Sequence, residues 1–451
     1  MAVTSAEQRH QMLNEPVGPL LFRKAVPMVL TQMITVIYNT ADTYFVAKIN
    51  TEASAAVGVA FSLMAIIQAV GFGMGMGTGS LISRQLGAAK DEQARTTANS
   101  GLLLGALFGT VLLILGLLFL RPLMSLLGAS ENVLPYAADY STYILIAAPF
   151  MCASFVLNNI LRSEGQTTLS MVGMMTGGLM NLALDPLMIF GLDMGIKGAA
   201  AATMIGQMTG LAVLCSFFFT KKSIIKIAPG AISRKIRVYT DIIRTGSPTI
   251  LRQGLASLAT AILNNQAAHF SDAAVAAVSI SNKLYMLSRN IVLGIGQGFQ
   301  PVAGYCYGAG RYDRVKKSFW LSTAAGTVIV VIIAIAMYLF RTDIMTWFRA
   351  DDEVIGIGSQ CLLYSCISIP MMAYSTFVNQ TYQCLGFAGG ASLLASCRQG
   401  IFYVPLAFAL PALIGITGIE MLQPAADILT FLVSIPFQIH FFRRHLDSSY
   451  Q

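Results

Sequence analysis

Long apolar runs alternate with short polar segments along the whole chain. About twelve of these runs approach the roughly 20 mostly apolar residues that a membrane-spanning helix needs. They begin near residues 25, 54, 98, 133, 167, 197, 242, 273, 318, 354, 391 and 418. The apolar positions do not alternate with period two, as they would in the strands of a membrane barrel. The pattern therefore predicts an all-α polytopic membrane protein with twelve transmembrane helices.

The composition supports the same interpretation. The 451 residues are 55% hydrophobic and 11% charged, whereas soluble domains carry about 25% charged residues. A water-soluble chain of this length could not bury so much apolar surface. The net charge of +8 falls mostly in short loops, which favours a role in membrane topology over a nucleic-acid partner. Residues 1–19 are polar, so we expect no cleavable signal peptide.

The basic residues predict the orientation in the membrane. If the N-terminus is cytoplasmic, most of the 29 Lys and Arg residues lie in segments that face the cytoplasm. The opposite loops hold only Lys48, Arg121, Lys197, Arg341 and Arg349. Cytoplasmic loops are enriched in Lys and Arg, so we expect a multi-pass protein of the plasma membrane with both termini in the cytoplasm.

The two halves of the chain repeat one design. A displacement of about 221 positions aligns Pro27 with Pro248, Gln32 with Gln253, Asn158 with Asn379, and glycines 73, 75 and 77 with glycines 294, 296 and 298. We expect an N-lobe over residues 1–221 with helices 1–6, a cytoplasmic linker over 222–240, and a C-lobe over 241–451 with helices 7–12. Because each half has six helices, an even number, the two halves insert into the membrane in the same orientation. Two parallel six-helix bundles around a cleft are the architecture of an alternating-access transporter.

The motifs of enzymes and metal sites are missing from the sequence. The seven cysteines are scattered and form no C-x-x-C, and the four histidines do not cluster. No H-E-x-x-H, P-loop or G-x-S-x-G occurs, so we expect neither an enzyme nor a cofactor. The stretch GFGMGMGTGS at residues 71–80 lies inside an apolar run. Its glycines recur every four residues, which predicts close helix packing and not phosphate binding.

Acidic residues inside the apolar runs of the first half are the candidate chemistry. Asp42 lies in the first run, within IYNTADTYFVA. Asn181 and Asp185 are four residues apart in NLALDP, so they share one helix face, and Pro186 frees a backbone carbonyl. Such oxygen ligands suit Na⁺, and a carboxylate also suits a proton. A charge in the bilayer costs roughly 2.5–3.5 kcal/mol, which favours a functional role; the alternative is a protonated Asp in a structural hydrogen bond between helices.

The buried polar groups of the second half are different: Arg252, Lys283, Arg289, Arg398 and Asp427. Arg252 and Arg398 lie about two turns from the inner surface, where a long side chain can extend to the interface. Lys283 and Arg289 lie deeper, and either pair with Asp427 or line the cleft. The candidate residues of a substrate cleft are Gln32, Gln253, Lys283, Arg289 and Asn379. The 23 methionines suit a surface that accommodates many shapes, with gap filling between helices as the alternative.

Four stretches carry a resemblance to a known family. They are PMVLTQMITVIYNTADTYFVAKI, ISRQLGAAKDEQA, NNILRSEGQTTLSMVGMMTGGLMNLALDPLMIFGLDMGIKGAAAAT and GIGQGFQPVAGYCYGAGRYDRVKK. The chain resembles the MATE family, the multidrug and toxic compound extrusion transporters, in its prokaryotic drug-efflux branch. The resemblance implies a MATE-like fold and the export of amphipathic, cationic organic compounds, driven by entry of H⁺ or Na⁺. We expect a monomer in the bilayer, with small-molecule drugs as its partners.

The resemblance also implies a site. It implies that Asp42 and Asp185 lie together in the N-lobe, that Asn181 and Thr203 complete a cation-coupling cluster, and that Asn158 lies nearby. Na⁺ would bind at Asp42, Asn181, Asp185 and Thr203. Some family members carry a coupling acid on the seventh helix, which here offers Arg252, Gln253, Asn264 and Asn265. The sequence therefore argues against a second cation site in the C-lobe.

Two other transporter classes remain as alternatives. A related lipid-linked saccharide flippase has an anionic substrate, which Lys283, Arg289 and Arg252 would suit, but that family usually has additional helices. A major-facilitator carrier has the same six-plus-six repeat. Its loop motif after the second helix needs Asp-Arg and a basic cluster, which SRQLGAAKDEQ lacks.

Overall fold

The computed structural model describes residues 4–348 and 351–447, which form helices and connecting loops without any strand. Arg349, one of the basic residues predicted to face outward, lies outside these ranges. The long helices of the first half are α2 (Val17–Ala47), α3 (Thr51–Gly87), α4 (Asp91–Leu118), α6 (Leu134–Ser163), α7 (Thr167–Pro186) with a π-helical turn η1 (Leu187–Gly191), and α8 (Gly195–Phe219). Shorter elements are α1 (Ser5–Asn14), α5 (Leu120–Leu126) and η2 (Pro229–Ala231).

The second half follows the same order. Its long helices are α9 (Ile236–Ala268), α10 (Asp272–Gly308), α11 (Tyr312–Leu339), α13 (Asp352–Cys384), the broken helix α14–η3–α15 (Ala388–Ser396, Cys397–Ile401 and Tyr403–Ile414) and α16 (Ile416–His445), with a short α12 (Arg341–Phe348). In the described part of the chain, ten helices are long and apolar enough to cross a membrane. The more polar α9 and α10 are 33 and 37 residues long. Together they make the predicted twelve.

The helix boundaries confirm the internal repeat. Helix α3 begins at Thr51 and α10 at Asp272, and the sixth helix of each half begins at Gly195 and at Ile416. Both pairs are separated by 221 positions. The fifth helix of each half contains a π-helical turn, η1 or η3, and such turns are frequent at functional sites. The repeat therefore extends through all six helices of each half.

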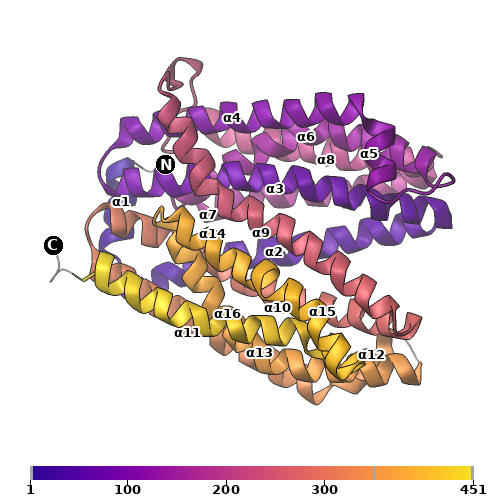
Figure 1. Ribbon diagram of the computed structural model, residues 1–451. Helices are drawn as coiled ribbons and strands as arrows, with labels where there is room; N and C mark the ends of the chain where they lie inside the picture. The colour runs from indigo at the N-terminus through magenta and orange to yellow at the C-terminus, as the bar shows by residue number, and fades with distance from the viewer. Residues whose placement is uncertain (1–3, 349–350, 448–451) are drawn as a thin grey trace. The chain divides into compact units, whose positions relative to one another are not determined.

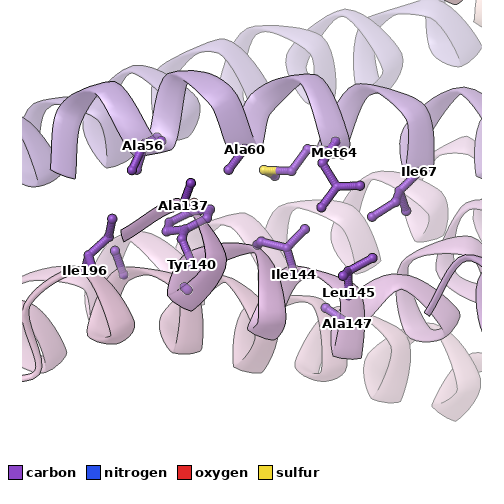
Figure 2. Close-up of a cluster of buried hydrophobic side chains, with 14 of the residues drawn as sticks. Ala56, Ala60, Met64, Ile67, Ala137, Tyr140, Ile144, Leu145, Ala147 and Ile196 are labelled. Atoms are coloured by element: carbon purple, nitrogen blue, oxygen red, sulfur yellow. The ribbon is translucent and has the colours of Figure 1, made fainter. Parts of the chain in front are cut away.

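The chain folds into two compact units. One comprises the chain up to Glu15, Leu30–Gln253 and Gly304–Gly310; the other comprises Pro16–Val29, Gly254–Ala303 and the chain from Arg311 onward. In the first unit, α3, α4, α6 and α8 pack beside one another (Figure 1). Figure 2 shows the apolar core between α3 and α6, where Ala56, Ala60, Met64 and Ile67 face Ala137, Tyr140, Ile144 and Leu145. In the second unit, α13 packs against α11 and α16.

The glycine-rich stretch of α3 packs against helices on two faces, as its spacing predicts. A Cβ atom at Gly75 would lie 2.7 Å from the backbone oxygen of Phe155 on α6. On the opposite face, a Cβ atom at Gly77 would lie 2.1 Å from the backbone oxygen of Ile242 on α9. Only a residue without a side chain allows these backbones to approach so closely.

A buried carboxylate holds the segment that follows α8. Glu164, just beyond the end of α6, is fully buried. It accepts hydrogen bonds from the Ser223 hydroxyl at 2.7 Å and from the backbone N–H groups of Ile224 and Ile225, both at 3.0 Å. Burial raises the pKa of Glu164 to about 7, and the three hydrogen bonds oppose this rise.

Candidate functional site

Asp42 is buried in the first unit, on α2. Only 5% of the surface of Asp42 is exposed. One carboxylate oxygen, Oδ2, accepts a long hydrogen bond of 3.5 Å from the Tyr140 hydroxyl on α6. The other oxygen, Oδ1, is buried and has no hydrogen-bond partner among the described residues. An unpaired buried oxygen of this kind is costly unless a proton or a cation joins it.

Asp185 lies at the end of α7, where the helix changes to the π-helical turn. It is fully buried, and its Oδ1 accepts a hydrogen bond from Asn181 Nδ2 at 3.1 Å. The same Nδ2 group lies 3.2 Å from the hydroxyl oxygen of Thr203 on α8. The second oxygen of Asp185, Oδ2, is buried without a hydrogen-bond partner in the described residues. The amide thus orients one oxygen and leaves the other available.

Helices α2, α6, α7 and α8 bring these groups into one cluster. The two carboxylates are close enough to interact electrostatically with each other, and both interact with the Tyr140 hydroxyl. No Lys or Arg forms an ion pair with either acid within the described ranges. Nor do these ranges contain a group of three or more His, Cys, Asp and Glu side chains able to hold a metal ion. Carboxylate oxygens of this kind are able to bind a proton or a hard cation such as Na⁺.

The other predicted residues lie elsewhere. Asn158 is buried, but its amide donates to the Ser170 carbonyl at 2.9 Å. Asn379, its repeat equivalent, donates to the Ala391 carbonyl at 2.6 Å. Each asparagine therefore ties the fourth helix of its half to the start of the fifth. Of the remaining candidates, Gln32 and Gln253 are half-buried, Lys283 is exposed and Arg289 is buried.

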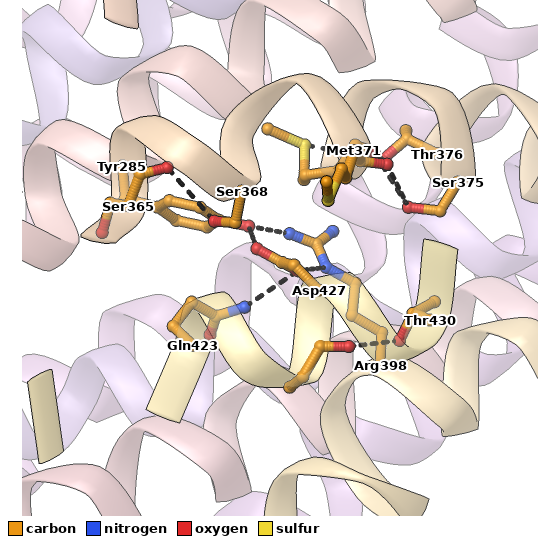
Figure 3. A network of polar contacts seen from close by, with 12 residues as sticks. Tyr285, Ser365, Ser368, Met371, Ser375, Thr376, Arg398, Gln423, Asp427 and Thr430 are labelled. Carbon is orange, nitrogen blue, oxygen red and sulfur yellow. Dashed lines mark hydrogen bonds and ion pairs between the residues drawn. The ribbon is translucent and has the colours of Figure 1, made fainter. Parts of the chain in front are cut away.

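A second polar cluster lies in the other unit, where the structure corrects one interpretation of the sequence (Figure 3). Arg398 does not extend to the membrane surface. Its Nε donates to Asp427 Oδ1 at 2.8 Å, and its side chain is 11% exposed beside a fully buried Asp427. The Tyr285 hydroxyl donates to Asp427 Oδ2 at 2.5 Å, and Gln423 Nε2 donates to Oδ1 at 3.2 Å. Asp427 therefore forms its ion pair with Arg398 on η3.

Two tyrosines of these clusters were not predicted from the sequence. Tyr140 and Tyr285 are ordinary members of apolar runs until the fold places their hydroxyls against Asp42 and Asp427. The only feature of the sequence that could have identified them is the aromatic hydroxyl, since a buried tyrosine usually forms a hydrogen bond with a polar partner.

Comparison with known proteins gives consistent matches along the chain. The MatE family model matches residues 27–187 and 248–409, once in each half. A Shewanella oneidensis protein named FAD transporter is 27% identical, with 94% of each chain covered. The Staphylococcus aureus strain MSSA476 protein named multidrug export protein MepA is 26% identical, over 92% of this chain and 91% of that protein.

Solved structures share the fold. A crystal structure of a MATE protein in complex with MaL6 superposes with a TM-score of 0.92 at 24% identity, over 96% of this chain and 98% of that one. An outward-facing multidrug resistance MATE transporter superposes with a TM-score of 0.91 at 24% identity, over 96% and 97% of the two chains. These matches confirm the predicted twelve-helix architecture. The chain belongs to the MatE family, the MATE transporters, and is a multi-pass membrane transporter and not an enzyme.

Proposed function

We propose that this transporter is a secondary active exporter of amphipathic, cationic organic compounds, exchanged for H⁺ or Na⁺ by alternating access. It works as a monomer in the plasma membrane, with both termini in the cytoplasm. One observation carries the proposal: Asp42 and Asp185 form a buried pair, and each has a carboxylate oxygen without a hydrogen-bond partner among the described residues. Such a pair changes its charge when a cation binds, which is what ion coupling requires.

The cycle follows from the energetics of that pair. Two neighbouring carboxylates in a site of low dielectric constant repel each other and are poorly solvated. A proton or Na⁺ entering from outside neutralises part of this charge and changes the packing around α2. The rearrangement releases the drug outside. Loss of the cation to the cytoplasm restores the charged pair, and the inward-facing form then takes up the next drug molecule.

The proposed substrate class is supported by a relative named as a multidrug export protein. A second candidate, export of a flavin dinucleotide, is supported by the relative named FAD transporter. Lys283 favours an anionic substrate, because it is an exposed cation within the long helix α10. A charge within a spanning helix is costly in contact with lipid, so such residues face the bundle interior or a water-filled cavity, or extend to the interface.

Transport assays separate these possibilities. The chain is reconstituted in liposomes, an H⁺ or Na⁺ gradient is imposed, and movement of a fluorescent cationic dye or of FAD is followed. Asp42→Asn and Asp185→Asn should each abolish gradient-driven transport while the protein remains folded. Asp193→Asn is the matched control, because Asp193 is exposed in a loop at a φ of 53°, which asparagine adopts readily. Full gradient-driven export by Asp42→Asn would refute the mechanism.

A further inference from the structure

The segment between α8 and α9, together with the first turns of α9, concentrates positive charge. Between positions 221 and 244, seven side chains are basic and only Asp241 is acidic. All seven basic side chains are exposed, and none forms an ion pair with a residue in the described ranges. We call them the basic surface: Lys221, Lys222, Lys226, Arg234, Lys235, Arg237 and Arg244. This surface is available to an anionic partner.

Buried polar groups hold the backbone that carries these side chains. Asn99 on α4 accepts a hydrogen bond from the Ala228 N–H at 2.9 Å and donates one to the Lys226 carbonyl at 3.3 Å. The adjacent Ser100 hydroxyl accepts from the Ser233 N–H at 2.9 Å, and η2 packs against α4 (Figure 1). Near its start, the segment makes the three hydrogen bonds to the buried carboxylate described above. The basic side chains therefore project from a fixed scaffold.

Exposed apolar side chains lie at both ends of the segment. Phe219, the last residue of α8, is 81% exposed, and Ile236, the first residue of α9, is 76% exposed. Ile236 and Ile243 are seven positions apart on α9 and so share one face of the helix. Arg237 and Arg244 follow with the same spacing, which places a basic row next to the apolar row. Such an arrangement suits a lipid interface, where apolar side chains meet the acyl chains and basic ones reach the head groups.

The location of the basic surface favours lipid over nucleic acid. The segment joins α8 to α9, two of the twelve predicted spanning helices, so it lies at the membrane surface. Basic clusters next to spanning helices are attracted to anionic head groups over about 8 Å at physiological ionic strength. Single-stranded nucleic acid is instead bound with aromatic side chains on which its bases stack. The one aromatic residue at positions 221–244 is the half-buried Tyr239, whose hydroxyl donates to the Ser233 carbonyl at 2.8 Å.

We propose that the basic surface binds the phosphate groups of anionic phospholipids, with Phe219 and Ile236 in contact with their acyl chains. The guanidinium groups offer paired donors that match a phosphate, and the lysines add positive charge. In the orientation proposed above, these lipids belong to the cytoplasmic leaflet. Binding requires neither transport nor the carboxylates of the coupling site, so failure of the proposed function would leave it intact.

A fluorescent reporter in the full-length chain tests lipid binding at this position. The two native tryptophans are Trp320 and Trp347, so the variant Trp320→Phe/Trp347→Phe/Ile236→Trp has a single indole, placed beside the basic surface. In bilayers of mixed composition, its quenching by brominated phosphatidylglycerol is compared with its quenching by brominated phosphatidylcholine. We expect phosphatidylglycerol to bind there at least about fivefold more strongly, because one basic residue near an anionic surface contributes a factor of that order.

Matched variants assign the preference to the basic surface. Trp320→Phe alone keeps Trp347, which is 86% exposed on α12, and this control reporter should show little preference between the two lipids. In the first reporter protein, Arg234→Gln/Arg237→Gln should remove most of the preference for phosphatidylglycerol. Arg234→Lys/Arg237→Lys retains both charges and should keep most of it, which separates loss of charge from misfolding.

Three results would overturn the proposal. One is equal binding of the two lipids at the Ile236→Trp reporter, and another is a preference that Arg234→Gln/Arg237→Gln leaves unchanged. The third is binding of a fluorescent DNA duplex to the basic surface at physiological salt without any preference for phosphatidylglycerol, which would assign the surface to nucleic acid. Raising the salt to about 1 M should weaken the lipid preference, because charges are then screened within about 3 Å.

Discussion

The ion pair between Arg398 and Asp427 allows a quantitative prediction. Each charge is almost completely removed from solvent, with Arg398 11% and Asp427 0% exposed, and the two are joined at 2.8 Å. Replacing Arg398 with Met leaves the Asp427 carboxylate buried without its cation. Breaking a buried pair in this way costs about 3–5 kcal/mol. Asp427→Asn should cost a similar amount, because it leaves the guanidinium unpaired.

The double variant Arg398→Met/Asp427→Asn should recover most of this loss. Both charges are absent, and the single Asn oxygen can still accept one of the two hydrogen bonds that Tyr285 and Gln423 donate to separate oxygens of Asp427. Replacing both members of a buried pair is often close to neutral. We therefore expect the two substitutions to be non-additive by at least about 2 kcal/mol, since residues in direct contact commonly couple by 0.5–3 kcal/mol.

The free energy of unfolding is measured by titrating the purified protein with SDS and following its helical circular dichroism. Lys197→Met is the control, because its ion pair with Asp139 is 51% and 46% exposed and such surface pairs contribute about 0–1 kcal/mol. Additive losses in the double variant would refute the reasoning. They would mean that the two charges do not compensate each other in the folded protein.

Two further predictions concern packing and pH. Gly77→Ala should destabilise the protein by about 1–3 kcal/mol, because the added Cβ would lie 2.1 Å from the Ile242 carbonyl oxygen. Gly58→Ala is the control on the same helix, because no atom lies within 4 Å of the Cβ added there. Equal unfolding free energies for the two variants would contradict the packing. Glu164 has a folded pKa of about 7 against an ordinary 4.5, so its stabilising contribution is complete below about 4.5 and is lost as the pH rises through about 7. Glu164→Gln should therefore flatten the dependence of the unfolding free energy on pH in that window, whereas Glu131→Gln, at an exposed site, should retain the wild-type slope.

The sequence alone determined the helices and the repeat. A spanning helix is specified by the length of an apolar run, and a duplication is visible as a constant offset between similar residues. Both can be recognised without knowing which helices contact each other. The small-residue spacing of α3 also predicted close packing, which the contacts of Gly75 and Gly77 confirm. The costs of intramembrane charge identified Asp42 and Asp185 as candidates, because hydrocarbon penalises any charge whatever its neighbours.

Only the tertiary structure decided which groups meet. Tyr140 lies 98 residues from Asp42, and Arg398 lies 29 residues from Asp427 on a different helix. Insertion energetics require a buried charge to be compensated but do not specify the partner. That choice depends on the rotation of each helix and on its neighbours, which a sequence pattern does not contain.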